Sequence, residues 1–123
     1  MKRELNIEAL RNYCISKPFV TEEFPFDEVT LVFKVAGKMF ALIPLDESRQ
    51  IISLKCDPER AIELREQYPA IKAAYHMNKK HWNMIEINGS VNSELVYGLV
   101  DHSYGLIFNA LPKRTRDQLL LDK

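Results

Sequence analysis

A hairpin pattern in residues 29–45 constrains the fold of this chain more than any other feature. Large apolar side chains occupy every second position of residues 29–35 and alternate there with Thr30 and Lys34. Ala36-Gly37 then predicts a tight reversal, after which residues 39–45 return as a second strand. One-sided alternation of this kind is typical of an antiparallel sheet with one face on the core.

Two more strands and three helices follow from similar signals. Residues 51–55 and 84–87 are strand-like, so we expect about four strands in total. Asn6 can cap a first helix that ends before Pro18, and Asn92 and Glu94 can begin a last long helix, with apolar residues from Leu95 to Ala110, that Pro112 ends. Asp57-Pro58 predicts a third helix that ends near residue 68. We expect the N- and C-terminal helices to cover one face of the sheet.

Length and composition predict one domain of mixed α/β (α+β) class over residues 1–123. The chain has 123 residues, of which 46% are hydrophobic, enough for one core. No signal-like apolar run follows Met1, and no segment reaches the roughly 18 apolar residues of a membrane span. We therefore expect a cytoplasmic protein without a membrane partner. Only residues 119–121 remain as an unassigned apolar segment, so we expect a monomer.

Several local features have a structural interpretation. Cys14 and Cys56 are far apart in the sequence and predict buried thiols. Phe24 and Phe26 flank a proline in an acidic loop over residues 20–28, so we expect them to plug an edge of the core. Two glycines inside the last long helix each cost about 1 kcal/mol relative to alanine, so we expect close packing there. They are Gly98 and Gly105.

Ordered blocks along the chain resemble the MmcQ/YjbR family of small bacterial proteins. The blocks are Phe24-Pro25-Phe26, FKVAGKMF at residues 33–40, SLKCDP at residues 53–58, YHMNKKHWN at residues 75–83, Ser103-Tyr104 and Leu111-Pro112-Lys113. One departure is that Ala73-Ala74 precede the YHMNKKHWN block, where the family pattern has Pro-Gly. The resemblance implies a frataxin-like (CyaY-like) fold and DNA binding.

The distribution of charge indicates where DNA would bind. Seventeen basic and seventeen acidic residues cancel, so any affinity for DNA must come from local patches. Residues 29–45, 67–85 and 102–116 contain no acid. If the first hairpin and the loop over residues 75–83 project on the same side, they form two basic wings able to straddle a phosphate backbone. The candidate DNA-binding residues are Lys34, Lys38, His76, Asn78, Lys79, Lys80, His81, Asn83, Lys113 and Arg114.

The other polar and aromatic residues of these windows have two interpretations each. Trp82 can be buried under the loop, which we favour, or can stack on bases at the surface. Asn78 and Asn83 can fix the loop backbone, or can read adenine. Tyr75 and Tyr104 are expected to close the loop over the last long helix.

No motif in the sequence predicts a cofactor, a metal site or an enzyme. His76 and His81 share neither a helix face nor a strand face, and no cysteine or carboxylate completes a ligand set. Phosphate-binding glycine loops, nucleophile elbows and paired carboxylates are absent from the sequence. The alternative to DNA binding is a non-enzymatic module for a protein partner or small ligand, bounded by Trp82, Tyr104 and the last long helix. Acids interleaved among the lysines, such as Glu63, Glu66 or Glu86, would favour this alternative.

Overall fold

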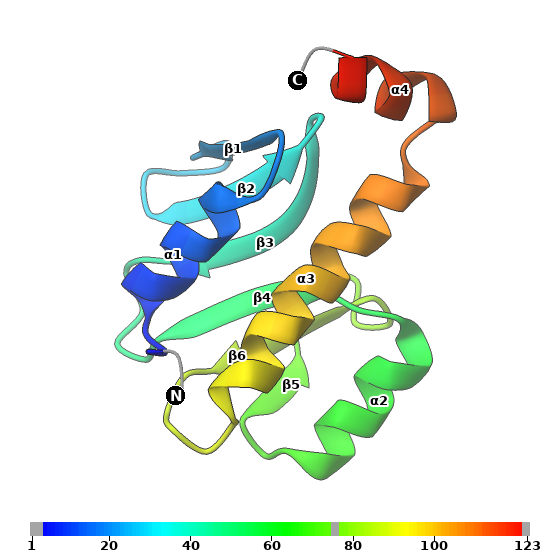
Figure 1. Cartoon of the computed structure of the whole chain (residues 1–123). Helices are drawn as coiled ribbons and strands as arrows, with labels where there is room; N and C mark the ends of the chain where they lie inside the picture. The colour runs from blue at the N-terminus through cyan, green and yellow to red at the C-terminus, as the bar shows by residue number, and fades with distance from the viewer. Residues whose placement is uncertain (1–3, 75–76, 122–123) are drawn as a thin grey trace.

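The computed structural model describes residues 4–74 and 77–121, and a six-stranded sheet organises them (Figure 1). The strands run in the order β1-β2-β3-β4-β6-β5, and every pair of neighbours is antiparallel. Their bounds are β1 (Val20–Glu23), β2 (Thr30–Val35), β3 (Lys38–Pro44), β4 (Ile51–Lys55), β5 (Ile71–Ala73) and β6 (Trp82–Glu86). The mixed α/β fold with an antiparallel sheet is therefore as predicted.

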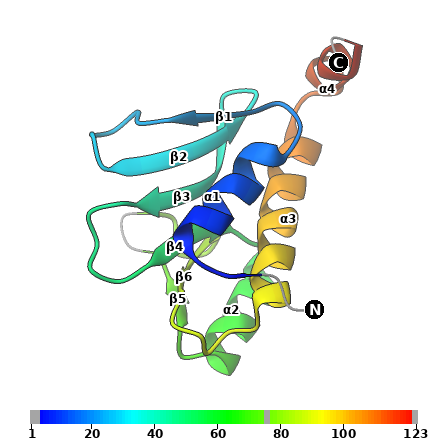
Figure 2. The ribbon, with the colours of Figure 1, turned by 60° about the vertical axis from the view of Figure 1, so that its left-hand side comes forward.

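Four helices are described: α1 (Ile7–Ser16), α2 (Pro58–Gln67), α3 (Ser93–Ala110) and α4 (Lys113–Leu121). As predicted, α1 and α3 lie on one face of the sheet (Figure 2). The predicted caps are also present, because the side chains of Asn6, Asp57 and Asn92 accept hydrogen bonds from backbone N–H groups in the first turns. Helix α4 stands away from the sheet at the C-terminal end (Figures 1 and 2).

The expectation of about four strands was too low. Strand β1 occupies part of the segment predicted as an acidic loop, and β5 is a three-residue strand that no pattern indicated. Both are the outermost strands of the sheet, and such short strands are defined by their pairing partners more than by their own residues. The edge-plug prediction for Phe24 and Phe26 was wrong as well, since these side chains are 48% and 64% exposed.

Apolar side chains fill both faces of the sheet. The larger cluster lies under α1 and α3 and includes Phe33, Phe40 and the two predicted buried thiols, Cys14 and Cys56. Burial raises the pKa of Cys14 to about 12 and also raises that of Cys56. A smaller cluster contains alternate strand residues, which point to the helix-free face. It consists of Val32, Leu42, Ile51, Ala74, Trp82 and Met84, with Met39 and Met77 packed against it.

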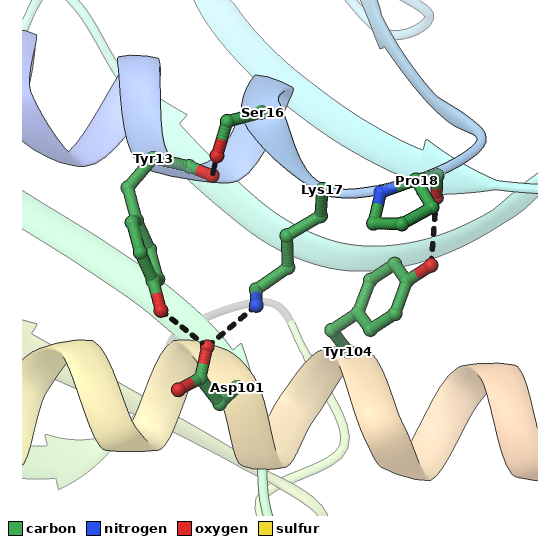
Figure 3. Close-up of polar contacts among 6 residues, drawn as sticks. All are labelled: Tyr13, Ser16, Lys17, Pro18, Asp101 and Tyr104. Carbon is green, nitrogen blue, oxygen red and sulfur yellow. Dashed lines mark hydrogen bonds and ion pairs between the residues drawn. The ribbon is translucent and has the colours of Figure 1, made fainter.

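Helices α1 and α3 are joined by a group of polar and aromatic contacts (Figure 3). The Tyr13 hydroxyl donates to Asp101 Oδ1 at 2.7 Å, and Lys17 Nζ lies 2.5 Å from the same oxygen. Tyr104 donates its hydroxyl to the Pro18 carbonyl at 2.6 Å. Phe19 follows with a φ of 66°, a conformation that this anchored connection holds in place. Lys17 is thus part of the packing between helices.

The close packing expected at Gly98 and Gly105 is absent. A Cβ atom placed on either glycine would meet no atom within 4 Å beyond its chain neighbours and the local backbone of α3. These glycines weaken α3 without a compensating approach by any of the described residues.

Candidate nucleic-acid interface

The strand register brings four lysines to one end of the sheet. Val35 pairs with Lys38 at the β2–β3 turn, where Ala36 and Gly37 have φ values of 50° and 80°. The antiparallel pairing of β3 with β4 places Lys55, the last residue of β4, toward this same end. Lys55 pairs in turn with Trp82, the first residue of β6, which directly follows the loop with Lys79 and Lys80. We call Lys38, Lys55, Lys79 and Lys80 the basic end; Lys55 is half-buried and the others are exposed.

Six acids lie at the opposite end, although Asp57 and Glu59 begin α2 beside Lys55, and Glu63 and Glu66 are exposed on the same helix. The β1–β2 and β3–β4 loops both lie at this opposite end, because each joins strands that meet at that end of the sheet. Glu86, one of the acids that could have interleaved with the lysines, ends β6 on this side and lies 3.9 Å from Arg49. We call this the acidic end; its acids are Glu23, Asp27, Glu28, Asp46, Glu47 and Glu86.

Three consecutive backbone N–H groups at the junction of β4 and α2 donate hydrogen bonds to other elements. Lys55 N–H donates to Ser103 Oγ at 3.0 Å, Cys56 N–H to the His81 carbonyl at 2.7 Å, and Asp57 N–H to His102 Nε2 at 3.1 Å. The position of Lys55 is therefore fixed by both α3 and the loop before β6. Sequence reasoning missed Lys55, because it lies next to the acidic segment that begins at Asp57.

Ser103 bridges two strands where their pairing stops. Its side chain is fully buried, and its hydroxyl donates to the Phe40 carbonyl at 2.5 Å while accepting from Lys55 N–H. The register between β3 and β4 covers only two residue pairs, Ala41 with Leu54 and Leu42 with Ser53. The sequence signal for this role was a serine inside the apolar stripe of α3.

The loop before β6 is ordered by its own backbone and by α2. Asn78 Oδ1 accepts from Lys80 N–H at 2.9 Å, and the Asn78 carbonyl accepts from His81 and Trp82 N–H. This is the turn-fixing role that the sequence predicted for Asn78. The Arg65 guanidinium donates to the Lys79 carbonyl at 2.8 Å, so the two loop lysines are presented from a braced backbone.

Burial argues against one candidate residue, Asn83, and an ion pair partly neutralises another, Lys34. Asn83 is only 3% exposed; its Nδ2 donates to the Ala61 carbonyl at 3.2 Å, and its Oδ1 accepts from Arg65. An amide buried under α2 cannot read a base. Lys34 lies on β2 with its Nζ 3.4 Å from Glu23 Oε1, because β1 brings an acid beside a window that contains none in sequence.

The aromatic candidates Trp82 and Tyr104 pack against other side chains of the fold. Trp82 is 8% exposed in the cluster on the helix-free face, as we expected, which leaves its ring no free face for base stacking. The Tyr104 ring meets Phe40 edge to face, and burial raises the pKa of its hydroxyl. Tyr75 and His76 lie outside the described residues.

The remaining candidates, His81, Lys113 and Arg114, differ in burial and in whether their side chains are paired. His81 is half-buried and bonds through its backbone, as described above. Lys113 and Arg114 begin α4, and Lys113 Nζ lies 2.7 Å from Asp117 Oδ2 one turn later. Arg114 is exposed. In Figures 1 and 2, α4 stands on the side of the β2–β3 turn, far from the β1–β2 loop.

Other kinds of site find little support among the described residues. A cavity of about 10 Å³ lies between β4, α2 and α3, room for roughly one water molecule. Within residues 4–74 and 77–121, no three His, Cys, Asp or Glu side chains are grouped to hold a metal ion. None of the described helices is both long and apolar enough to span a bilayer.

Comparison with known proteins identifies the family. The YjbR family model matches residues 15–106. Protein YjbR of Escherichia coli (strain K12) is 34% identical over 116 residues, which cover 94% of this chain and 98% of that protein. The chain belongs to the YjbR family. Another relative, YbdF of Escherichia coli O157:H7, is 33% identical over 91% of this chain and 92% of its own length.

Solved structures agree with the YjbR fold described above. The crystal structure of Deinococcus radiodurans protein DR2400, with a DUF419 domain, has a TM-score of 0.88 and 40% identity, covering 93% of this chain and 87% of that one. A Pseudomonas syringae protein has a TM-score of 0.71 and 27% identity, covering 84% of this chain and 99% of that one. The family resemblance stated from the sequence is thereby confirmed.

Proposed function

We propose that this YjbR-family protein binds the phosphate backbone of duplex DNA, weakly and without sequence preference, through its basic end. The observation that supports this is the separation of charge along the strands, with Lys38, Lys55, Lys79 and Lys80 at one end and six acids at the other, while Asp57 and Glu59 at the start of α2 are the acids next to the basic end. A chain of zero net charge can attract a polyanion only through such a separation.

The character of the side chains supports binding without base reading. Lysines act as point charges toward phosphates, whereas base recognition needs amides or arginines aimed at base edges. Of the two amides in the loop segment, Asn83 is buried and Asn78 uses its Oδ1 within the turn. We further propose that the protein acts as a cytoplasmic, non-enzymatic binding module that is monomeric at micromolar concentration.

A salt titration of fluorescent duplex DNA tests this function. Four phosphate contacts predict a slope of log affinity against log salt of about −3 to −4 between roughly 50 and 200 mM salt. The double variant Lys79→Ala, Lys80→Ala should flatten that slope by about two units. The matched control, Lys72→Ala with Arg49→Ala, removes the same charge from exposed positions outside the basic end and should leave the slope unchanged.

Two results would contradict the proposal. One is no binding by the wild type at low salt up to hundreds of micromolar. The other is an equal loss of affinity in the Lys79, Lys80 variant and in the control, which would mean that only total charge matters. Either result would favour the alternative of a protein partner.

A further inference from the structure

An exposed apolar patch lies at the acidic end, away from the proposed DNA site. It consists of Phe24, Phe26, Val29 and Leu45, which are 48%, 64%, 36% and 49% exposed. The first three come from the β1–β2 loop and the fourth from the β3–β4 loop, and Leu45 N–H donates to the Val29 carbonyl at 2.7 Å. We call these four residues the aromatic patch. Four large exposed apolar side chains in two adjacent loops are typical of interaction sites.

The β1–β2 loop, which carries three residues of the aromatic patch, is braced by Asp27. The Asp27 carboxylate accepts from the N–H groups of Val29 and Thr30 at 2.9 and 2.6 Å, and from the Thr30 hydroxyl at 3.0 Å. These hydrogen bonds lower the pKa of Asp27, so the carboxylate stays ionised and the turn persists at neutral pH. A pre-ordered loop loses little conformational entropy when a partner binds.

Charge around the patch defines the chemistry of its partner. Glu23, Asp27, Glu28, Asp46 and Glu47 lie in the same two loops or at their borders, and the one base there, Arg49, lies 3.9 Å from Glu86, so the net charge around the patch is negative. A partner must therefore combine apolar side chains with positive charge, since like charges facing each other across an interface are costly.

Helix α4 of the same chain has this combination. Leu120 and Leu121 are 56% and 79% exposed, and α4 contains no buried residue. Lys113, Arg114 and Arg116 lie in its first half, and the one acid of the helix, Asp117, pairs with Lys113, so Arg114 and Arg116 carry its net positive charge. Cations at a helix N-terminus add to the positive end of the helix dipole, so this half of α4 carries a concentrated positive potential.

The patch and α4 of one molecule cannot meet. Both views place α4 on the side of the β2–β3 turn and the β1–β2 loop at the other end of β1 and β2, so the length of these strands separates them (Figures 1 and 2). Only an α4 from another molecule can reach the patch.

We propose that α4 of one molecule docks on the aromatic patch of a second copy of this chain, head to tail. Leu120 and Leu121 cover the phenylalanines, while the bases of α4 face the surrounding acids. A helix of nine residues buries little area, so the contact is weak, and the protein associates only well above micromolar concentration. Because the contact joins two different surfaces, it propagates from molecule to molecule.

Complementation between two variants tests this contact. Phe24→Ser with Phe26→Ser removes the patch, and Leu120→Ser with Leu121→Ser removes the apolar part of α4. All four side chains are exposed, so both variants should fold. In sedimentation velocity at about 0.5 mM protein and low salt, the wild type should associate beyond the dimer, and each variant alone should stay monomeric.

An equimolar mixture of the two variants gives the decisive result. One variant retains the helix and the other retains the patch, so the mixture should form a heterodimer and nothing larger. Ile62→Ser, at a 49% exposed position on α2, is the matched control and should associate like the wild type. A monomeric wild type, association by either variant alone, or a mixture without heterodimer would each overturn the proposal. A monomeric wild type would assign the patch to a basic segment of another protein.

Discussion

The Ser103 bridge makes a quantitative prediction about what holds the two halves of the sheet together. Strands β3 and β4 pair over only two residue pairs, and Ser103 supplies the next link by accepting from Lys55 N–H and donating to the Phe40 carbonyl. Ser103→Ala removes one hydroxyl but leaves two backbone groups without their partner. A buried group left unsatisfied costs about 1–3 kcal/mol.

The expected loss follows from how each backbone group is buried. The bond to the Phe40 carbonyl is buried, so that oxygen should lose close to the full amount, whereas the Lys55 N–H is partly buried and can recover some energy from water. We therefore expect Ser103→Ala to lower the free energy of unfolding by about 2–4 kcal/mol.

Urea denaturation, followed by circular dichroism, measures this loss. Ser16→Ala is the matched control, because it deletes the same atom from an exposed hydrogen bond to the Tyr13 carbonyl and should cost less than about 1 kcal/mol (Figure 3). Hydrogen exchange at the Lys55 amide should also become faster in Ser103→Ala. A loss below about 1 kcal/mol, or one equal to that of Ser16→Ala, would refute the reasoning.

Three other predictions follow from particular residues. Trp82→Ala should cost about 3 kcal/mol or more in the same denaturation assay, because it empties the cluster on the helix-free face; a loss below about 1 kcal/mol would return Trp82 to the candidate site. Gly105→Ala should stabilise α3 by about 0.5–1 kcal/mol, since the added methyl meets open space; a lower melting temperature would contradict this. Burial lowers the pKa of His102; the charge of Arg60 lowers it further, and that of Asp57 opposes the shift. The neutral Nε2 of His102 accepts a hydrogen bond from Asp57 N–H. The stabilisation by His102 is thus complete above about pH 6.5 and lost as pH falls through the folded pKa, so the stability difference between wild type and His102→Gln should shrink from about pH 7 to 5. A constant difference would show that His102 does not titrate in this way.

Local signals in the sequence determined most of the secondary structure. Helix caps at Asn6, Asp57 and Asn92 act within a few residues, and each predicted helix begins where its cap stands. The Ala36-Gly37 turn depends on the positive φ of two adjacent residues, and strand β4 matches its predicted bounds. The sequence blocks that resemble the YjbR family can likewise be recognised from residue identity alone.

Contacts between distant segments decided the rest. Strands β1 and β5 exist because β2 and β6 offer pairing partners, which no local pattern records. Asn83 is buried under α2, and Glu23 pairs with Lys34 across strands, so residues far away in sequence changed the environment of two candidates for DNA contact.

The separation of charge depends on both the sequence and the tertiary structure. The sequence by itself determined which segments are acidic and which contain no acid. The tertiary structure decided that the acidic β1–β2 and β3–β4 loops lie at the end opposite to the β2–β3 turn and the loop before β6, because consecutive loops of antiparallel strands alternate between the two ends of a sheet. The acids Asp57 and Glu59 are the exception, since they begin α2 next to Lys55 at the basic end. The strand order and the register therefore turn a chain of zero net charge into a molecule with one basic and one acidic end.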